Sequence, residues 1–172
     1  MTEQTRMTLG TVLLVLFRIL FTGFAVYTTW FIFSNSMEVA AVSSAKSAQV
    51  LQSVNGLMTQ LGLDKLSSYE IRKLAHFAEF AVLGFWFMCC LRVYTRKYIR
   101  HISWPLLLGL VIANVDETIQ LYVAGRSSSV SDVWIDFGGV CAGVLAAFCL
   151  LLLLGSLLYL MGFGRGRARQ PA

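Results

Sequence analysis

The sequence has few charged residues, and this scarcity limits the class of protein that it can encode. Asp, Glu, Lys and Arg together make up 13% of its 172 residues, whereas hydrophobic residues make up 57%. A typical soluble domain contains about 25% charged residues. With a mean hydropathy of +0.69, the composition excludes the ordinary soluble class. It indicates an all-α, polytopic membrane protein with a single domain over residues 1–172.

Cysteine and histidine are also scarce, and their positions do not indicate a metal centre. The four cysteines lie within apolar runs, without the spacing of metal ligands: Cys89, Cys90, Cys141 and Cys149. We expect them to be small buried hydrophobic side chains. His76 is the single histidine within an expected membrane span, and His-x-x-Glu, here His76 and Glu79, occurs often by chance. We therefore predict no metal site, and the sequence does not identify a cofactor.

The formal net charge of +5 does not indicate a nucleic-acid partner, because the basic residues lie beside apolar segments. There they report membrane topology. Four apolar runs are long enough to cross a bilayer, and we expect spans over residues 8–33, 70–93, 102–122 and 132–163.

The strongly basic loop between the second and third spans contains Arg92, Arg96, Lys97, Arg100 and His101. By the positive-inside rule this loop is cytoplasmic. Both termini, with the short basic tail 164–172, are then inside, and the expected location is the cell membrane, multi-pass, N-in and C-in. Arg18 within the first span either extends to the cytoplasmic headgroups or pairs with an acidic residue of another helix.

The segment 34–68 is predicted to lie outside the membrane. It is serine-rich at first, and then apolar residues recur at helical spacing before Gly62 ends the run: Val50, Leu51, Val54, Leu57, Met58 and Leu61. The periodic part is too short to span a bilayer. It is typical of an amphipathic helix on the membrane surface or over the mouth of the bundle.

Three local patterns predict where helices begin and how closely they pack. Ser67-x-x-Glu70 and Ser129-x-x-Asp132 have the form of capping boxes and predict the starts of the second and fourth spans. On the fourth span, Gly139 and Gly143 stand four residues apart. This small-xxx-small spacing indicates close contact with another helix.

Ionisable residues gather at the ends of three spans that this topology places on the outer side. Facing lipid, each such charge costs roughly 2.5–3.5 kcal/mol, so these groups must face one another or a wet cavity. Spacings of three and four residues place Arg72, His76 and Glu79 on one face, and Asp132 and Asp136 on another. Asp116 and Glu117 each share a face with Gln120 on the third span. We therefore predict a polar pocket open to the outer leaflet and covered by the segment 34–68.

The residue types in this pocket suit two kinds of chemistry. Neighbouring carboxyl and imidazole groups can hold different protonation states and so transfer protons; the candidates for a catalytic role are His76, Glu79, Glu117 and Asp136. Cations and hydrogen-bonding groups at headgroup height can hold an anion; the candidates are Arg72, Lys73, Gln120, Arg126, Ser127 and Asp132. The expected partners are a membrane lipid or a lipid-linked cell-wall intermediate.

Three functions remain open from these residues. The first is an outer-leaflet enzyme or lipid-modifying protein. The second is a non-catalytic binder or permeation protein for an antibiotic, a lipid carrier or protons; because four helices are few and no internal repeat is visible, a transporter would have to be an oligomer. The third is a structural membrane subunit whose buried ion pairs lock the bundle.

Two stretches, RKLAHFAEFAVLG (72–84) and DETIQLYVAGRSSSVSDVWIDFGGVCAG (116–143), resemble the signature stretches of the VanZ-like membrane proteins of Gram-positive bacteria. The segment 33–47, which begins FSNS, resembles a third, although its AAVSSAKS part carries little charge. The matching motif positions are Lys73, His76, Glu79, Glu117, Gln120, Gly125, Arg126, Ser127, Asp132, Asp136 and Gly139. The resemblance implies low-level resistance to lipoglycopeptide antibiotics such as teicoplanin, and it supplies no reaction.

Overall fold

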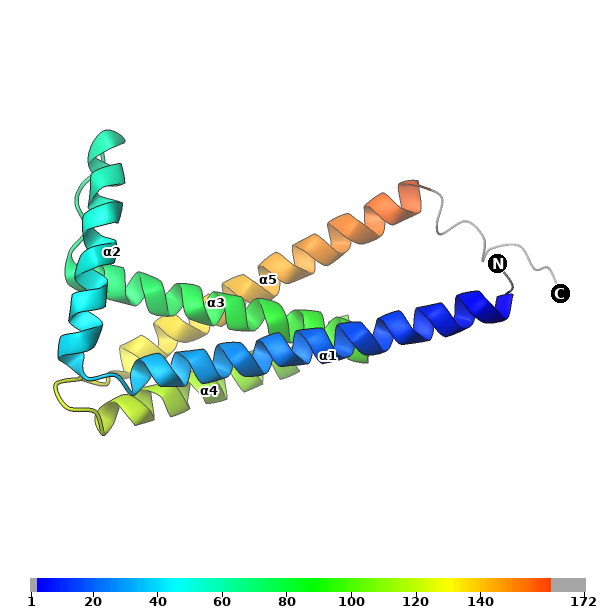
Figure 1. The fold of residues 1–172 in the computed structure, drawn as a ribbon, viewed down its shortest axis with the longest axis horizontal. Helices are drawn as coiled ribbons and strands as arrows, with labels where there is room; N and C mark the ends of the chain where they lie inside the picture. Colours follow the sequence, from blue (N-terminus) through cyan, green and yellow to red (C-terminus); the bar gives the residue numbers. More distant parts are fainter. Residues whose placement is uncertain (1–2, 162–172) are drawn as a thin grey trace.

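The computed structural model describes residues 3–161, and all its regular elements are helices (Figure 1). In chain order they are α1 (Glu3–Ser36), α2 (Ala40–Gln60), α3 (Ser68–Tyr94), the 3-10 helix η1 (Tyr98–His101), α4 (Ser103–Leu121) and α5 (Val130–Leu160). The described range contains no strand, so the predicted all-α class is confirmed. The predicted basic tail 164–172 and the last two residues of the predicted fourth span lie outside this range.

Four helical segments are long and apolar enough to cross a membrane: Gly10–Ser36, Ser68–Tyr94, Tyr98–Leu121 and Val130–Leu160. They agree with the four predicted spans to within a few residues. The start of α1 and the end of α5 lie at one end of the bundle, and the links α1–α2 and α4–α5 lie at the other (Figure 1). Large apolar side chains such as Ile19, Val26, Leu145 and Leu153 are exposed on the outer faces, as expected for surfaces that contact lipid.

The bundle is built around the contact between α3 and α5, the most extensive helix pair in the fold. A Cβ atom added at Gly139 would overlap the carbonyl oxygen of Phe77, and one at Gly143 would overlap that of Ala81. Gly84 on α3 stands equally close to the backbone of α5 at Val140. The prediction that Gly139 and Gly143 mark a close helix contact is confirmed.

The hydrophobic core lies beside this contact and includes residues of α1 and α4. Ile32, Phe80, Leu83, Met88 and Val140 are fully buried. Gly109 of α4 admits the side chain of Val140, because a Cβ at position 109 would overlap its methyl groups. The core therefore joins all four long helices.

Helix α2 runs across one end of the bundle, nearly perpendicular to the long helices (Figure 1). If those helices cross the bilayer, α2 lies along its surface, as its apolar periodicity predicts. Leu51, Val54 and Met58 are half-buried, whereas Val50 and Leu57 are exposed. The helix begins at Ala40, earlier than the periodicity indicated, and its serine-rich first half places hydroxyls such as that of Ser47 against carbonyl oxygens one turn back.

One of the two predicted capping boxes forms. At the start of α3, the Ser67 side chain accepts from the Glu70 amide and the Glu70 carboxylate accepts from the Ser67 amide. At the start of α5, the prediction is wrong in detail. Ser129 is the N-cap, but its hydroxyl accepts from the Ser131 amide. The Asp132 carboxylate does not accept from the Ser129 amide, because it contacts the Lys73 ammonium instead.

Of the two surroundings that the sequence left open for Arg18, the pairing with an acidic residue is not found among the described residues. The Arg18 Nε donates to the carbonyl oxygen of Val93 at 3.1 Å, and its guanidinium lies 5.2 Å from the centre of the Tyr94 ring. A cation at this place satisfies a free carbonyl at the C-terminal end of α3 and interacts favourably with the helix dipole. Arg18 therefore fixes α1 against the end of α3.

The close α3–α5 contact can be tested with two glycines of α5. Gly143→Ala should lower the free energy of unfolding by about 1–3 kcal/mol, because the methyl group forces the two backbones apart. Gly155→Ala is the matched control, since nothing lies within 4 Å of a Cβ there, and it should cause no loss. Thermal unfolding of both variants in detergent is the measurement. Equal melting temperatures would show that α3 and α5 do not approach this closely.

Candidate functional site

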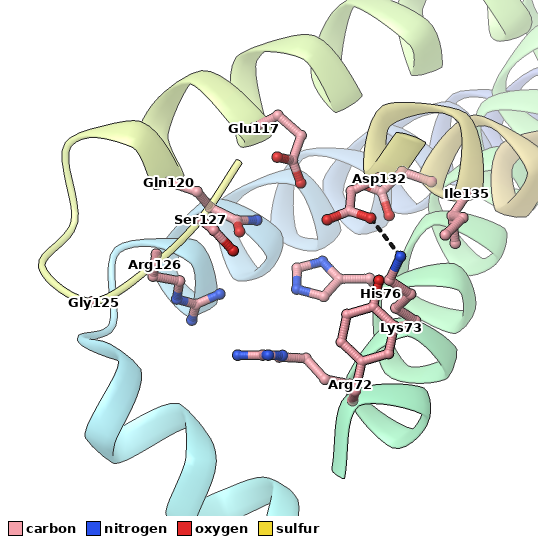
Figure 2. Close-up of a pocket in the computed structure, with 12 residues that line it drawn as sticks. Arg72, Lys73, His76, Glu117, Gln120, Gly125, Arg126, Ser127, Asp132 and Ile135 are labelled. Atoms are coloured by element: carbon pink, nitrogen blue, oxygen red, sulfur yellow. Dashed lines mark ion pairs between the residues drawn. The ribbon is translucent and has the colours of Figure 1, made fainter. Parts of the chain in front are cut away.

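A polar cavity opens at the end of the bundle where α1, α4 and α5 meet the start of α3 (Figure 2). Its volume is about 90 Å³, which is room for several water molecules or a small anion. It is lined by side chains from α3, α4, the loop 122–129 and α5: Tyr69, Arg72, Lys73, His76, Glu117, Gln120, Gly125, Arg126, Ser127, Asp132, Ile135 and Asp136.

Nine of the ten site residues predicted from the sequence line this cavity. The exception is Glu79, which faces an adjoining cavity formed by α3, Arg126 and the first half of α2. There the Glu79 carboxylate accepts a hydrogen bond from Asn35 at 3.0 Å. The segment 34–68 was predicted to cover the pocket; its first part instead lines the adjoining cavity, and the rest of α2 extends past the bundle (Figure 1).

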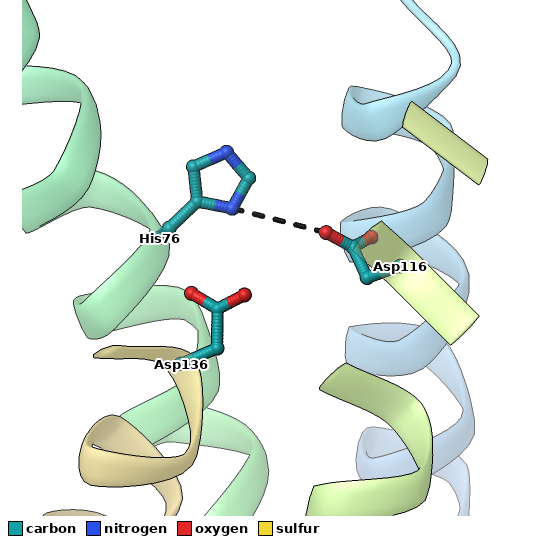
Figure 3. Close-up of side chains that lie close together, drawn as sticks. All are labelled: His76, Asp116 and Asp136. Atoms are coloured by element: carbon teal, nitrogen blue, oxygen red, sulfur yellow. Dashed lines mark ion pairs between the residues drawn. The ribbon is translucent and has the colours of Figure 1, made fainter. Parts of the chain in front are cut away.

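Three side chains from three different helices meet at the base of the cavity (Figure 3). The His76 Nδ1 lies 3.9 Å from the Asp116 Oδ2, and one ligand-type atom from each of His76, Asp116 and Asp136 lies within 4.8 Å of the other two. Asp116 is fully buried and Asp136 is 2% exposed. The Gln120 amide donates to the Asp116 Oδ2 at 3.1 Å and so fixes that carboxylate.

An ion pair on the far side of the cavity joins α3 to α5. The Lys73 ammonium lies 2.8 Å from the Asp132 Oδ1 and 4.4 Å from the centre of the Tyr69 ring. Both charged side chains are only about a quarter exposed. Because Lys73 already has a carboxylate partner, it is less available to hold an added anion than the sequence suggested.

Glu117 has a structural partner as well as a place in the cavity wall. Its Oε2 accepts from the backbone amide of Ser129 at 3.1 Å. Ser129 is the N-cap of α5, where a negative charge is stabilised by the free amides and the helix dipole. Glu117 therefore connects the end of α4 to the start of α5 across the loop 122–129.

Arg126 fastens the same loop to the end of α1. Its Nε donates to the Glu38 carbonyl oxygen at 3.1 Å, and a terminal nitrogen donates to the Asn35 carbonyl oxygen at 2.8 Å. Gly125 precedes it with φ +76°, a conformation that glycine adopts without strain. Burial, with a contribution from the positive charge of Arg72, lowers the pKa of the Arg126 guanidinium from its usual value, although arginine remains charged in proteins.

Arg72 extends toward Arg126 along one side of the cavity (Figure 2). Within the described range, no ion pair or hydrogen bond engages its guanidinium. Two guanidinium groups that face each other repel, and an anion between them would remove the repulsion and gain charge-assisted hydrogen bonds. The arrangement therefore favours an anion at this side of the cavity.

Buried polar atoms that lack a hydrogen-bond partner are concentrated at this site. In the described part of the chain they include His76 Nδ1, Glu79 Oε2, Asp116 Oδ1 and Asp136 Oδ2. Each such atom costs roughly 1–3 kcal/mol, and few occur in a folded protein. Their grouping indicates that the site is not built for stability alone.

Sequence reasoning missed four residues of the site. Asp116 was recognised as part of a polar face, but it was not among the predicted catalytic or binding residues; its spacing of four from Gln120 was the available signal. Asn35 and Ser36 lie in the FSNS stretch, where no role was predicted, and they contact Glu79 and Gln120. Tyr69 had no signal beyond its place at an expected helix start.

A family model described as VanZ/LLP1 matches residues 15–155 of the chain. This range includes every residue of the cavity and all or most of each of the four segments that can cross a membrane. No curated protein sequence and no solved structure matches the chain significantly.

The two hydrogen bonds of Arg126 lead to a stability prediction. Arg126→Lys cannot replace both, because a lysine side chain has no Nε donor and no planar fork. We expect the free energy of unfolding to fall by about 1–3 kcal/mol. Arg72→Lys is the control, because the Arg72 guanidinium has no hydrogen bond to lose within the described residues, and its unfolding should stay close to wild type. A drop of equal size in both variants would contradict the prediction; thermal unfolding in detergent measures it.

Proposed function

Because the chain belongs to the VanZ/LLP1 family and has four helices that can cross a membrane, we propose that it is a multi-pass protein of the bacterial cell membrane that binds and acts on an anionic lipid headgroup. The headgroup is that of a membrane lipid or of a lipid-linked cell-wall intermediate. The observation that carries this proposal is the polar cavity at one end of the spans, with the guanidinium groups of Arg72 and Arg126 on one wall.

The position of the cavity suits a lipid better than a free solute. It lies where the long helices end and where α2 runs across them, which is the level of the headgroups if α2 rests on the membrane surface. A lipid phosphate at this level reaches Arg72 and Arg126 without leaving the interface. Guanidinium groups bind phosphate through pairs of parallel hydrogen bonds, so two of them supply both charge and orientation.

The base of the cavity supplies the groups for a reaction on the bound headgroup. His76 and Asp136 line it beside the guanidinium wall, and Asp116 stands behind His76 at 3.9 Å. We assign His76 the transfer of a proton through Nε2, the ring nitrogen farther from Asp116, and Asp136 a place beside it as a second polar group that faces the headgroup. Glu117, predicted to take part in this chemistry, holds the Ser129 amide and on our proposal positions α5.

A non-catalytic binder of the same headgroup is the second candidate. The observation that favours it is that several charged groups of the cavity already have partners: Lys73 pairs with Asp132, and Arg126 holds two backbone carbonyls. Such a protein would sequester a lipid or a lipoglycopeptide without changing it. For either candidate, we propose reduced susceptibility to teicoplanin as the consequence for the cell.

The lipid function is tested by expressing the protein in a bacterial host and comparing lipid and muropeptide compositions. We expect wild type to change one of them and Arg72→Gln to abolish the change, because the headgroup loses its unpaired cation. Arg100→Gln, exposed in the basic loop at the other end of the bundle, should act like wild type at equal membrane abundance.

A full change of composition with Arg72→Gln would overturn the headgroup proposal. No change with wild type, together with retention of anionic phosphatidylglycerol by the purified protein and loss of that retention in Arg72→Gln, would establish the binder instead.

We also propose that the cavity faces the outside of the cell. Of the basic residues at the cavity end, Lys73 and Arg126 are engaged within the protein, whereas the basic loop at the other end is largely exposed and decides the orientation. With the native cysteines replaced, Ser128→Cys should react with a membrane-impermeant maleimide in intact cells. Lys97→Cys should react only after lysis. The reverse pattern would place the cavity on the cytoplasmic side.

A further inference from the structure

We propose that His76, Asp116 and Asp136 form a binding site for one divalent transition-metal ion, Zn²⁺ or Mn²⁺, at the base of the cavity. The three residues come from α3, α4 and α5 and point toward one another (Figure 3). The site goes beyond the proposed headgroup function and does not depend on it, because metal binding can be measured without any lipid.

The separations fit ligands of a shared ion better than they fit direct contacts. The His76 Nδ1 and Asp116 Oδ2 are 3.9 Å apart, too far for a hydrogen bond. Two ligands that each lie about 2.0–2.2 Å from one ion are themselves about 3–4 Å apart. The three ligand-type atoms lie within 4.8 Å of one another, so side-chain movements of less than about 1 Å would bring all three to coordination distance.

The burial of these groups is the second and independent observation. Asp116 is 0% exposed and Asp136 is 2% exposed. An oxygen of each, Asp116 Oδ1 and Asp136 Oδ2, has no hydrogen-bond partner, and neither has His76 Nδ1. Three adjacent groups that each keep an unpartnered buried atom are accounted for if a cation lies among them, since each of these atoms has a free lone pair when the imidazole is neutral and the carboxyls are ionised.

The balance of charge around His76, Asp116 and Asp136 also favours a bound cation. Six carboxyl groups surround the cavity and its neighbour: those of Glu38, Glu79, Asp116, Glu117, Asp132 and Asp136. Four cations face them, Lys46, Arg72, Lys73 and Arg126, and Lys46 pairs with Glu38. With neutral His76, two negative charges are left over at the buried end of the site. A divalent cation neutralises both charges at once. This matters in a membrane-embedded site, because little water is present to solvate them.

The donor set selects the class of metal. One imidazole nitrogen with two carboxylates suits Zn²⁺ or Mn²⁺ better than Ca²⁺ or Mg²⁺, which prefer oxygen donors alone. Gln120 bonds to the Asp116 carboxylate in the manner of the outer partners that orient metal ligands. Because His76 and Asp136 also line the cavity, one side of the ion would stay open to a water molecule or to a headgroup oxygen.

The test uses tag-free protein in detergent, stripped with a chelator and then supplied with Zn²⁺ or with Mn²⁺. We expect one ion per wild-type chain by elemental analysis and a higher melting temperature with the ion than without it. Asp116→Asn and Asp136→Asn should each weaken the affinity more than about 100-fold, because loss of a ligand exceeds the roughly 10- to 100-fold effect of an outer partner. Asparagine is close in shape to aspartate, and each substitution removes a buried charge, so both variants should still fold.

Glu79→Gln is the matched control, since it removes a buried carboxylate at the same level that is not one of the three ligands, and it should bind the ion like wild type. Arg72→Gln should also keep the ion, which separates this inference from the headgroup proposal. Wild-type protein that retains neither ion would overturn the metal site. Retention at full affinity in both aspartate variants, or equal loss in Glu79→Gln, would overturn it as well.

Discussion

The close approach of α3 and α5 is the constraint on which the cavity depends. Gly139 lies against the backbone at Phe77, so the residue before Phe77 and the residue one turn before Gly139 are brought to the same level. These residues are His76 and Asp136, two of the three side chains at the base of the cavity. Glycine at position 139 thus serves the site as much as the packing, since any larger residue would separate the helices that carry the two side chains.

The rest of the site follows from the need to satisfy ionisable groups where water is scarce. Lys73 and Asp132 satisfy each other between α3 and α5. Glu117 and Arg126 are satisfied by backbone groups at helix ends, an amide at the start of α5 and carbonyls near the end of α1. These contacts close the end of the bundle around a space that they do not fill. Arg72 is left without a partner among the described residues, and we assign it to the headgroup; His76, Asp116 and Asp136 keep unpartnered atoms, and we assign them to the metal.

Much of this architecture could be predicted from the sequence, because it follows from local rules. The spans follow from length and hydropathy, the α3 start from Ser67 and Glu70, and the shared level of the polar residues from their place near helix ends. The sequence could not show which face of α4 turns inward, so Asp116 was not singled out for a role beside Glu117. The sequence also could not show that the Asp132 carboxylate would pair with Lys73 of α3 and not form the expected capping box, because that ion pair depends on how α3 and α5 pack.

The short α4 fixes the depth of the cavity in the bilayer. Its 19 residues span about 28 Å, close to the roughly 30 Å thickness of the hydrocarbon core, whereas the 31 residues of α5 span about 46 Å and must tilt or emerge. The span that contains α4, Tyr98–Leu121, adds only the 3-10 helix η1 and Ile102 to this length, so it has less length in reserve than α5. Asp116, near its end, lies under the headgroups in a bilayer of matching thickness; a thicker bilayer would draw it into hydrocarbon, and a thinner one would expose it. Hydrophobic matching at α4 therefore controls how wet the base of the cavity is.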